Sequence, residues 1–88
     1  MSDVKKQFEK ATKDVTKVKK DPSNDLKLRL YAHFKQGTEG DVTGERPGFT
    51  DIKGRAKYDA WMKIKGMSQD DAMKAYTKLV ERVLRDDE

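Results

Sequence analysis

The segment that decides the fold is residues 31–61, YAHFKQGTEGDVTGERPGFTDIKGRAKYDAW. A helix-like run that carries aromatic residues and a lysine leads into a glycine-rich connection, and a second run of the same kind follows it. The connection takes roughly 14 residues, 37–50, whereas helix joints in small bundles usually take about 2–8. A connection of that length lets two successive helices run in the same direction instead of folding back on each other.

Outside this segment, apolar residues spaced three and four apart, with capping residues at the breaks, predict further helices. The four predicted ranges are about 3–18, 24–36, 51–65 and 68–85, with an error of about 2–4 residues at each end. No alternating strand pattern and no internal repeat is found in the sequence. The chain is therefore predicted to be an all-α four-helix bundle, a single domain over residues 1–88.

Local signals mark where these helices begin and end. Ser23 or Asn24, Thr50 or Asp51, and Ser68 have the side chains that cap a helix N-terminus. Gly37 suits the residue just after the end of the second helix, where a left-handed backbone is common. In the long connection, Val42 and Phe49 are the large apolar residues, and we expect them to pin this loop to the core.

Composition limits the class of protein further. With 34% apolar and 41% charged residues in a chain of 88, the core must consist of narrow stripes along the helices. The absence of cysteine excludes disulfides, thiolate metal sites and cysteine nucleophiles. No segment has the length and hydropathy of a membrane span or of a secretory signal. We expect a cytoplasmic monomer.

The charge distribution argues against a nucleic-acid surface, and the motifs argue against catalysis. A net charge of +4 permits an anionic partner, but acids and bases are too mixed for a dedicated nucleic-acid surface. The glycines match neither the dinucleotide-binding nor the P-loop pattern. The single histidine, His33, has no cysteine partner and cannot form a histidine-rich zinc site. We expect no catalytic residue, no metal and no cofactor.

Two pairs of an aromatic residue and a lysine are the remaining candidates for a site. Tyr31 and Lys35 are four residues apart, as are Lys57 and Trp61, so each pair shares one face of its helix. Such pairs suit a flat, anionic ligand: a nucleic acid, a nucleotide or a phosphorylated cofactor. They are also what a core aromatic residue beside a solvated lysine looks like, and residue types alone do not choose between the two.

The order of these residues does match a known pattern. Residues 31–61, with their Tyr-x-x-aromatic-Lys-Gln, Gly-Asp, Arg-Pro-Gly and Lys-Gly-x-Ala-Lys-aromatic-x-Ala-Trp blocks, and KGMSQDDAMKAY at residues 65–76 resemble the acyl-CoA-binding protein family. The resemblance extends from Phe8 to about Val83. It implies an up-down-down-up bundle that binds medium- to long-chain acyl-CoA esters reversibly, buffers them and carries them inside the cell.

The resemblance also implies which residues bind. Tyr31 would lie against the adenine, Lys35 and Lys57 would hold the 3′-phosphate and its surroundings, and Tyr76 would donate to the phosphate end. The other implied contact residues are Ala32, His33 and Phe34 beside Tyr31, and Val15 and Leu28, with Thr12, along the groove for the acyl chain. Transient contact with membranes or with enzymes that use acyl-CoA is also implied.

Three positions depart from the family pattern. Thr16 stands where a basic residue is usual, Phe34 where tyrosine is frequent, and Tyr58 where tryptophan is frequent. We keep Thr16 as a weaker contact and expect at most a lower affinity. Two alternatives remain open: a basic all-helical module that binds nucleic acid or protein, and an acyl-CoA hydrolase acting through His33.

Overall fold

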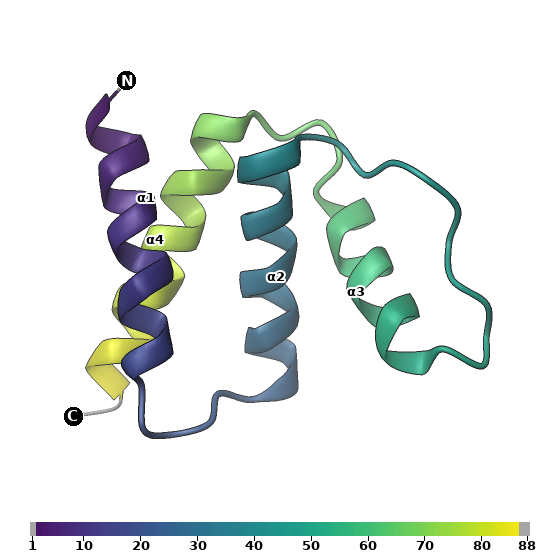
Figure 1. Cartoon of the computed structure of the whole chain (residues 1–88), viewed down its shortest axis with the longest axis horizontal. Helices are drawn as coiled ribbons and strands as arrows, with labels where there is room; N and C mark the ends of the chain where they lie inside the picture. Colours follow the sequence, from purple (N-terminus) through teal and green to yellow (C-terminus); the bar gives the residue numbers. More distant parts are fainter. Residues whose placement is uncertain (1, 87–88) are drawn as a thin grey trace.

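In the computed structural model, which describes residues 2–86, the chain is helical throughout apart from its connections (Figure 1). No strand occurs in these residues. The elements are α1 (Ser2–Asp14), a 3₁₀ helix η1 (Val15–Lys17), α2 (Asn24–Glu39), α3 (Ile52–Lys63) and α4 (Gln69–Asp86). The predicted all-α four-helix class is confirmed.

The long connection sets α2 and α3 parallel, while α1 and α4 both run the opposite way (Figure 1). This is the expected up-down-down-up order. Among the described residues, α4 packs against α1 and α2, whereas α3 packs only against α2. The molecule is a slab of 37 × 31 × 16 Å, with α3 and the long loop as a wing at one side.

The core lies between α1, α2 and α4. Its buried members are Phe8, Ala11, Leu30, Tyr76, Val80 and Val83. Burying each large member is worth roughly 1.5–3 kcal/mol, so these few side chains account for much of the packing energy. In α3, Trp61 is the only buried residue, so this helix depends on polar contacts as well.

The predicted N-caps are confirmed. The side chains of Ser23, Asp51 and Ser68 each accept a hydrogen bond from the backbone N–H three residues further on, at 3.1–3.2 Å. Each bond satisfies one amide that the first turn of a helix leaves without a partner.

The first helix changes character earlier than its predicted end at residue 18. Its α-helical part ends at Asp14 and a 3₁₀ turn continues to Lys17. The Thr16 hydroxyl donates to the carbonyl of Lys13 at 2.6 Å, and such side-chain bonds compete with helical hydrogen bonds. β-Branched Val15 and Thr16 also favour α-helix weakly.

The predicted role of Gly37 is wrong. The second helix continues through Gly37 to Glu39 and ends at Gly40, whose φ of 85° is the left-handed conformation expected of a terminating glycine. Gly37 is buried instead, and a Cβ there would lie 3.1 Å from the Cγ atom of Met73. The missing side chain lets α2 approach α4, and that contact could not be foreseen from local sequence.

The predicted anchoring of the long loop by Phe49 is also wrong, because that side chain is 78% exposed. Polar contacts hold the loop against α3. Arg46 donates to both carboxylate oxygens of Asp59, at 2.8 and 2.6 Å, and the Tyr58 hydroxyl donates to the carbonyl of Gly44 at 3.0 Å. The hydrogen bond from Arg46 lowers the pKa of Asp59. The hydroxyl that Tyr58 has, and tryptophan lacks, is therefore used structurally.

A buried glutamine, Gln36, fastens the ends of α2 and α3 to each other. Its side chain is fully buried; Oε1 accepts from Nε1 of Trp61 at 3.1 Å, and Nε2 donates to Asp41 and to the carbonyl of Met67, both at 2.8 Å. Trp61 also donates to the carbonyl of Gly40 at 2.9 Å. This network joins α2, α3 and both of their following connections, and it was not predicted from the sequence.

α3 and α4 also differ from their predicted ranges. α3 ends at Lys63, two residues before the predicted end, and a turn over residues 64–66 closes it with Gly66 at a φ of 95°. Ser68 stands just outside α4 as its cap.

Candidate ligand-binding site

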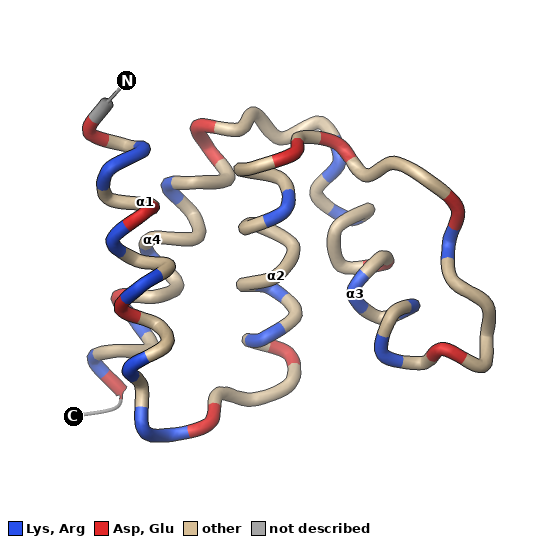
Figure 2. The backbone as a smooth tube through the Cα atoms, viewed as in Figure 1, with Lys and Arg blue, Asp and Glu red and all other residues tan. Residues whose placement is uncertain are grey.

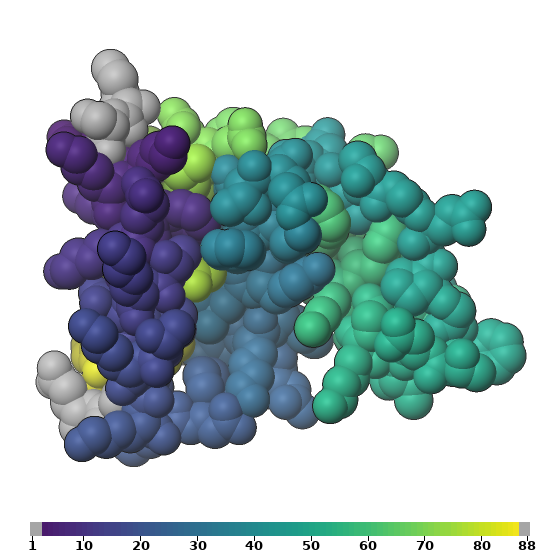
Figure 3. Space-filling model, in the orientation of Figure 1, coloured from purple at the N-terminus to yellow at the C-terminus, as the bar shows by residue number. Residues whose placement is uncertain are grey.

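A groove of about 470 Å³ lies between the N-terminal halves of α2 and α3. The space-filling view shows these ends of the two helices standing apart (Figure 3). Apolar side chains and lysines from both helices form the walls. The lining residues are Asn24, Lys27, Leu28 and Tyr31 from α2, and Ile52, Lys53, Ala56 and Lys57 from α3.

The two aromatic–lysine pairs form across the helices and not along them. The ammonium of Lys57 lies 5.4 Å from the ring centre of Tyr31, and that of Lys35 lies 5.2 Å from the ring of Trp61. Both distances are within the range of cation–π attraction. The shared helix faces were predicted correctly, but each lysine contacts the aromatic residue of the other helix. Tyr31 and Lys57 therefore meet at the edge of the groove.

Lys35 lies one turn beyond Tyr31 and already has an anionic partner. Its ammonium forms an ion pair with Glu39, and this hydrogen bond raises the pKa of Lys35. The Lys35 side chain is 23% exposed. An incoming phosphate would have to compete with the Glu39 carboxylate for this lysine.

Phe34 and Tyr76 belong to an aromatic cluster with Phe8. The ring of Tyr76 lies edge-on to Phe8 at 5.1 Å, and Phe34 lies 5.9 Å from Phe8 and 6.0 Å from Tyr76. Burial raises the pKa of the Tyr76 phenol, so the hydroxyl is protonated and can donate. Among the described residues this hydroxyl makes no hydrogen bond. Its oxygen is not completely enclosed by protein atoms. A ligand could therefore use it.

Ala32 and His33 do not line the groove at Tyr31. Ala32 is 2% exposed, and both residues border a separate hollow of about 580 Å³ between α2 and α3. Nδ1 of His33 lies 2.7 Å from the carbonyl oxygen of Arg29, a contact within its own helix. Their proposed ligand contacts stay predictions.

Val15 and Thr16 lie at the end of the first helix, which does not pack against α3. Val15 packs against the core, and Thr16 is exposed with its hydroxyl bonded to Lys13. Leu28, in contrast, lines the groove at Tyr31. Of the residues predicted to bind, the structure therefore brings Leu28, Tyr31 and Lys57 together.

Five lining residues were not predicted to bind: Asn24, Lys27, Ile52, Lys53 and Ala56. Lys27 precedes Tyr31 by four residues and Lys53 precedes Lys57 by four, so the spacing rule that paired Tyr31 with Lys35 would have found both. Ile52 and Ala56 are four residues apart and share one apolar side of α3. Ile52 is in fact 75% exposed, at the first turn of α3, where it lines the open groove.

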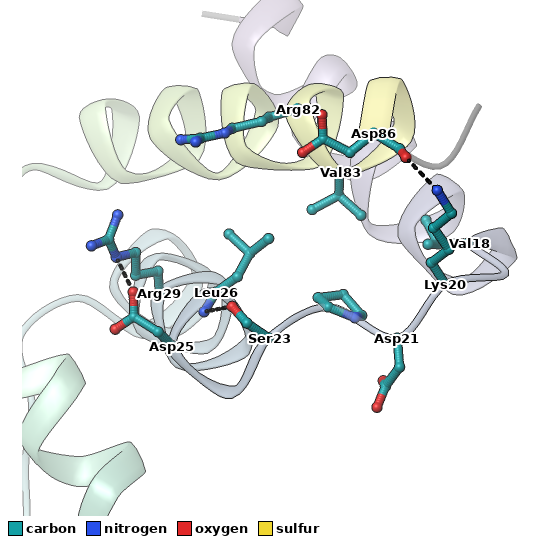
Figure 4. A pocket seen from close by; sticks show the side chains of 11 residues that line it. Val18, Lys20, Asp21, Ser23, Asp25, Leu26, Arg29, Arg82, Val83 and Asp86 are labelled. Carbon is teal, nitrogen blue, oxygen red and sulfur yellow. Dashed lines mark hydrogen bonds and ion pairs between the residues drawn. The ribbon is translucent and has the colours of Figure 1, made fainter.

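Another hollow, of about 380 Å³, lies at the far side of the bundle, between the connection of residues 18–23 and the end of α4 (Figure 4). Its three basic side chains, Lys20, Arg29 and Arg82, are matched by three acidic ones, Asp21, Asp25 and Asp86. Asp25 is paired with Arg29 at 3.2 Å. This balance gives no preference for an anion, unlike the three lysines of the α2–α3 groove.

Residues 2–86 contain neither a metal-binding cluster nor a membrane-spanning helix. No three His, Asp or Glu side chains come together in a way that could hold a metal ion. Over the same residues, no helix is both long and apolar enough to cross a membrane.

An apolar groove edged by three lysines and a tyrosine, between two parallel helices of a small bundle, defines an all-α protein built to bind an anionic, partly apolar ligand. The sequence profile of the family described as "Acyl CoA binding protein" matches residues 5–80. The chain belongs to the acyl-CoA-binding protein family.

Individual relatives agree with that assignment. "Acyl-CoA-binding protein homolog 1" of Caenorhabditis elegans is 52% identical over 77 residues, 88% of this chain and 90% of that protein. "Acyl-CoA-binding protein" of Saccharomyces cerevisiae is 44% identical, with 88% of each chain covered. The crystal structure of Oryza sativa acyl-CoA-binding protein 2 superposes with a TM-score of 0.93 at 35% identity, covering 97% of this chain and 92% of that one.

Proposed function

We propose that this protein binds medium- to long-chain acyl-CoA esters reversibly and without catalysis, and that it buffers and transports them. The observation that carries the proposal is the Lys57 ammonium over the Tyr31 ring, at the edge of a groove with apolar walls. Relatives named as acyl-CoA-binding proteins at up to 52% identity support the same ligand class.

The head group would bind where the aromatic ring and the lysines meet. A phosphomonoester carries about −1.5 to −2 charges at neutral pH, and compact lysine charges on rigid helices suit such a group. Tyr31 would stack on the adenine while Lys57 holds the 3′-phosphate. Lys35 would join after exchanging Glu39 for a phosphate oxygen, and Tyr76 would donate its hydroxyl.

The acyl chain would lie along the apolar walls, against Leu28, Ile52 and Ala56. Each buried methylene contributes roughly 0.8 kcal/mol before ordering costs are subtracted. Tail length should therefore dominate the affinity, while the lysines and Tyr31 select the CoA head group. Thr16, Val15, Ala32, His33 and Phe34 remain proposed contacts of lower weight.

Titration calorimetry with CoA, octanoyl-CoA and palmitoyl-CoA tests this function. We expect affinity to rise by orders of magnitude along the series and to keep a large apolar part at high salt. Equal affinity for the three ligands would contradict the proposal.

The alternative of a nucleic-acid module finds no support. Basic and acidic residues are mixed on every helix, and none is uniformly basic (Figure 2). Salt would abolish binding if phosphate contacts alone carried it. The cytoplasmic location and the monomeric state stay predictions.

A further inference from the structure

The long loop turns into α3 at an outer corner of the wing (Figure 1). Two large apolar side chains in this part of the chain are exposed to water. Phe49 is 78% exposed and Ile52 is 75% exposed, well above the other exposed large apolar residues, Met62 at 45% and Phe34 at 37%. Exposed patches of this kind mark interaction sites when charged or polar groups surround them.

The backbone holds Phe49 outward. The amide of Asp51 donates to the carbonyl of Gly48 at 2.9 Å and closes a turn, and Phe49 takes a corner position in it. Ile52 then begins α3, which packs against α2 alone among the described elements. No folded contact accounts for a phenyl ring at this corner.

The charges around the corner are mainly basic. Ile52 lines the groove together with Lys27, Lys53 and Lys57. Of the nearby acids, Asp51 is occupied as the cap of α3 and Asp59 is paired with Arg46. Glu45, in the loop, is the acid that remains exposed without such a contact.

We propose that this corner docks on the surface of an anionic lipid bilayer. Phe49 enters the headgroup region, the three lysines face lipid phosphates, and the groove opens toward the membrane. The proposal rests on the proposed function, since it gives the acyl chain a short path between bilayer and groove. Amphipathic contacts with apolar residues on one side and lysines on the other are typical of reversible membrane binding.

The shape of the corner favours a bilayer over a folded protein partner. A stable protein interface buries about 800 Å² on each side, whereas one aromatic side chain offers roughly 150–250 Å². A projecting tip with one aromatic and one aliphatic residue is too small for the former. It suffices for insertion between lipid headgroups.

Co-sedimentation with vesicles tests the proposal, using phosphatidylcholine alone and phosphatidylcholine mixed with phosphatidylserine. We expect the wild type to bind the mixed vesicles better, and Phe49→Ser to weaken that binding about tenfold through lost apolar burial. High salt should weaken the wild type as well, because it screens the lysines. Phe49→Leu should keep most of the binding. Met62→Ser, which removes an exposed apolar side chain elsewhere on α3, is the matched control.

Calorimetry on the same variants separates the two proposals. Phe49 does not line the groove, so Phe49→Ser should keep the affinity for palmitoyl-CoA in vesicle-free buffer. Loss of vesicle binding with intact ligand binding supports docking. Equal vesicle binding by the wild type and Phe49→Ser overturns it, and so does a dimer that Phe49→Ser abolishes. A wild type that binds vesicles but no acyl-CoA would overturn the proposed function alone.

Discussion

Tyr31 and Lys57 show how single residues set the chemistry of the groove. Their attraction needs no ligand, so the ring and the ammonium are already near the positions from which they would hold an adenine and a phosphate. Lys35 is different, because Glu39 must be displaced before it can bind a phosphate. Preorganised contacts cost less on binding than contacts that must first be exchanged.

Substituting Lys57 tests its proposed contact with the phosphate of the ligand. We expect Lys57→Ala to weaken both CoA and palmitoyl-CoA about ten- to a hundredfold, the loss of one charge-assisted contact of roughly 1.5–3 kcal/mol. Calorimetry measures the affinities, and circular dichroism should show unchanged helix content. Lys63→Ala, on the same helix but outside this groove, serves as control. Loss of helix content in Lys57→Ala would give the residue a structural role.

Glu39→Gln tests the exchange at Lys35. Removing the carboxylate frees the ammonium, so we expect CoA to bind a fewfold more tightly, in line with the modest worth of a surface ion pair. The hydrogen bond with Glu39 is the main cause of the raised pKa of Lys35, so this pKa should fall toward its ordinary value in the variant. Weaker CoA binding in this variant would mean that Glu39 positions Lys35 for the ligand.

At the scale of elements, what could be predicted was local. Helix number, N-caps and the parallel pair follow from spacing, capping side chains and loop length. The failures depend on contacts between residues distant in sequence: Gly37 against Met73, Tyr58 and Arg46 in place of Phe49, and Lys57 over Tyr31. Such contacts need the packed arrangement of the helices, which no window of sequence contains.

The Gln36 network provides a prediction at this scale. Gln36→Leu would remove the hydrogen-bond donor to the Met67 carbonyl and one of the two acceptors of the Trp61 N–H. Because these groups are shielded from water, we expect a loss of about 2–4 kcal/mol in the free energy of unfolding. Urea denaturation measures it. Gln69→Leu is the control, because that amide makes a single long hydrogen bond, 3.4 Å. An equal effect of both substitutions would contradict the role of Gln36.

Low pH should weaken the hydrogen bonds that the carboxylates of Asp41 and Asp59 accept. Backbone hydrogen bonding from Gly66 lowers the pKa of Asp41, and hydrogen bonding from Arg46 lowers that of Asp59. A lowered pKa in the folded state means that the stabilisation is complete above the unfolded value, near pH 4, and is lost as the pH falls through the folded value.

Urea midpoints at neutral pH and at about pH 3 measure this loss. We expect Asp41→Asn to reduce the difference between the two midpoints. Glu45→Gln, in the same loop, should leave the difference unchanged. An Asp41→Asn variant with the full acid sensitivity of the wild type would show that this carboxyl is not responsible.

At the scale of the whole molecule, the helices differ in how many neighbouring helices they pack against. α4 has two helical neighbours, and α2 also has two, whereas α3 has α2 alone. Helices with fewer buried contacts open more readily. We therefore expect the amides of α3 to exchange with deuterium faster than those of α2 and α4. Palmitoyl-CoA should slow exchange most in the N-terminal half of α3. Uniform exchange in all four helices would contradict this division.

The position of the buried Gln36 amide has a further consequence. It fastens α2 to α3 at their C-terminal ends, while the groove lies between their N-terminal ends. The two helices are therefore joined at their C-terminal ends and separated by the groove at their N-terminal ends. We expect the N-terminal ends to be able to separate without breaking a hydrogen bond of the Gln36 network, which would let the proposed groove admit acyl chains of different length.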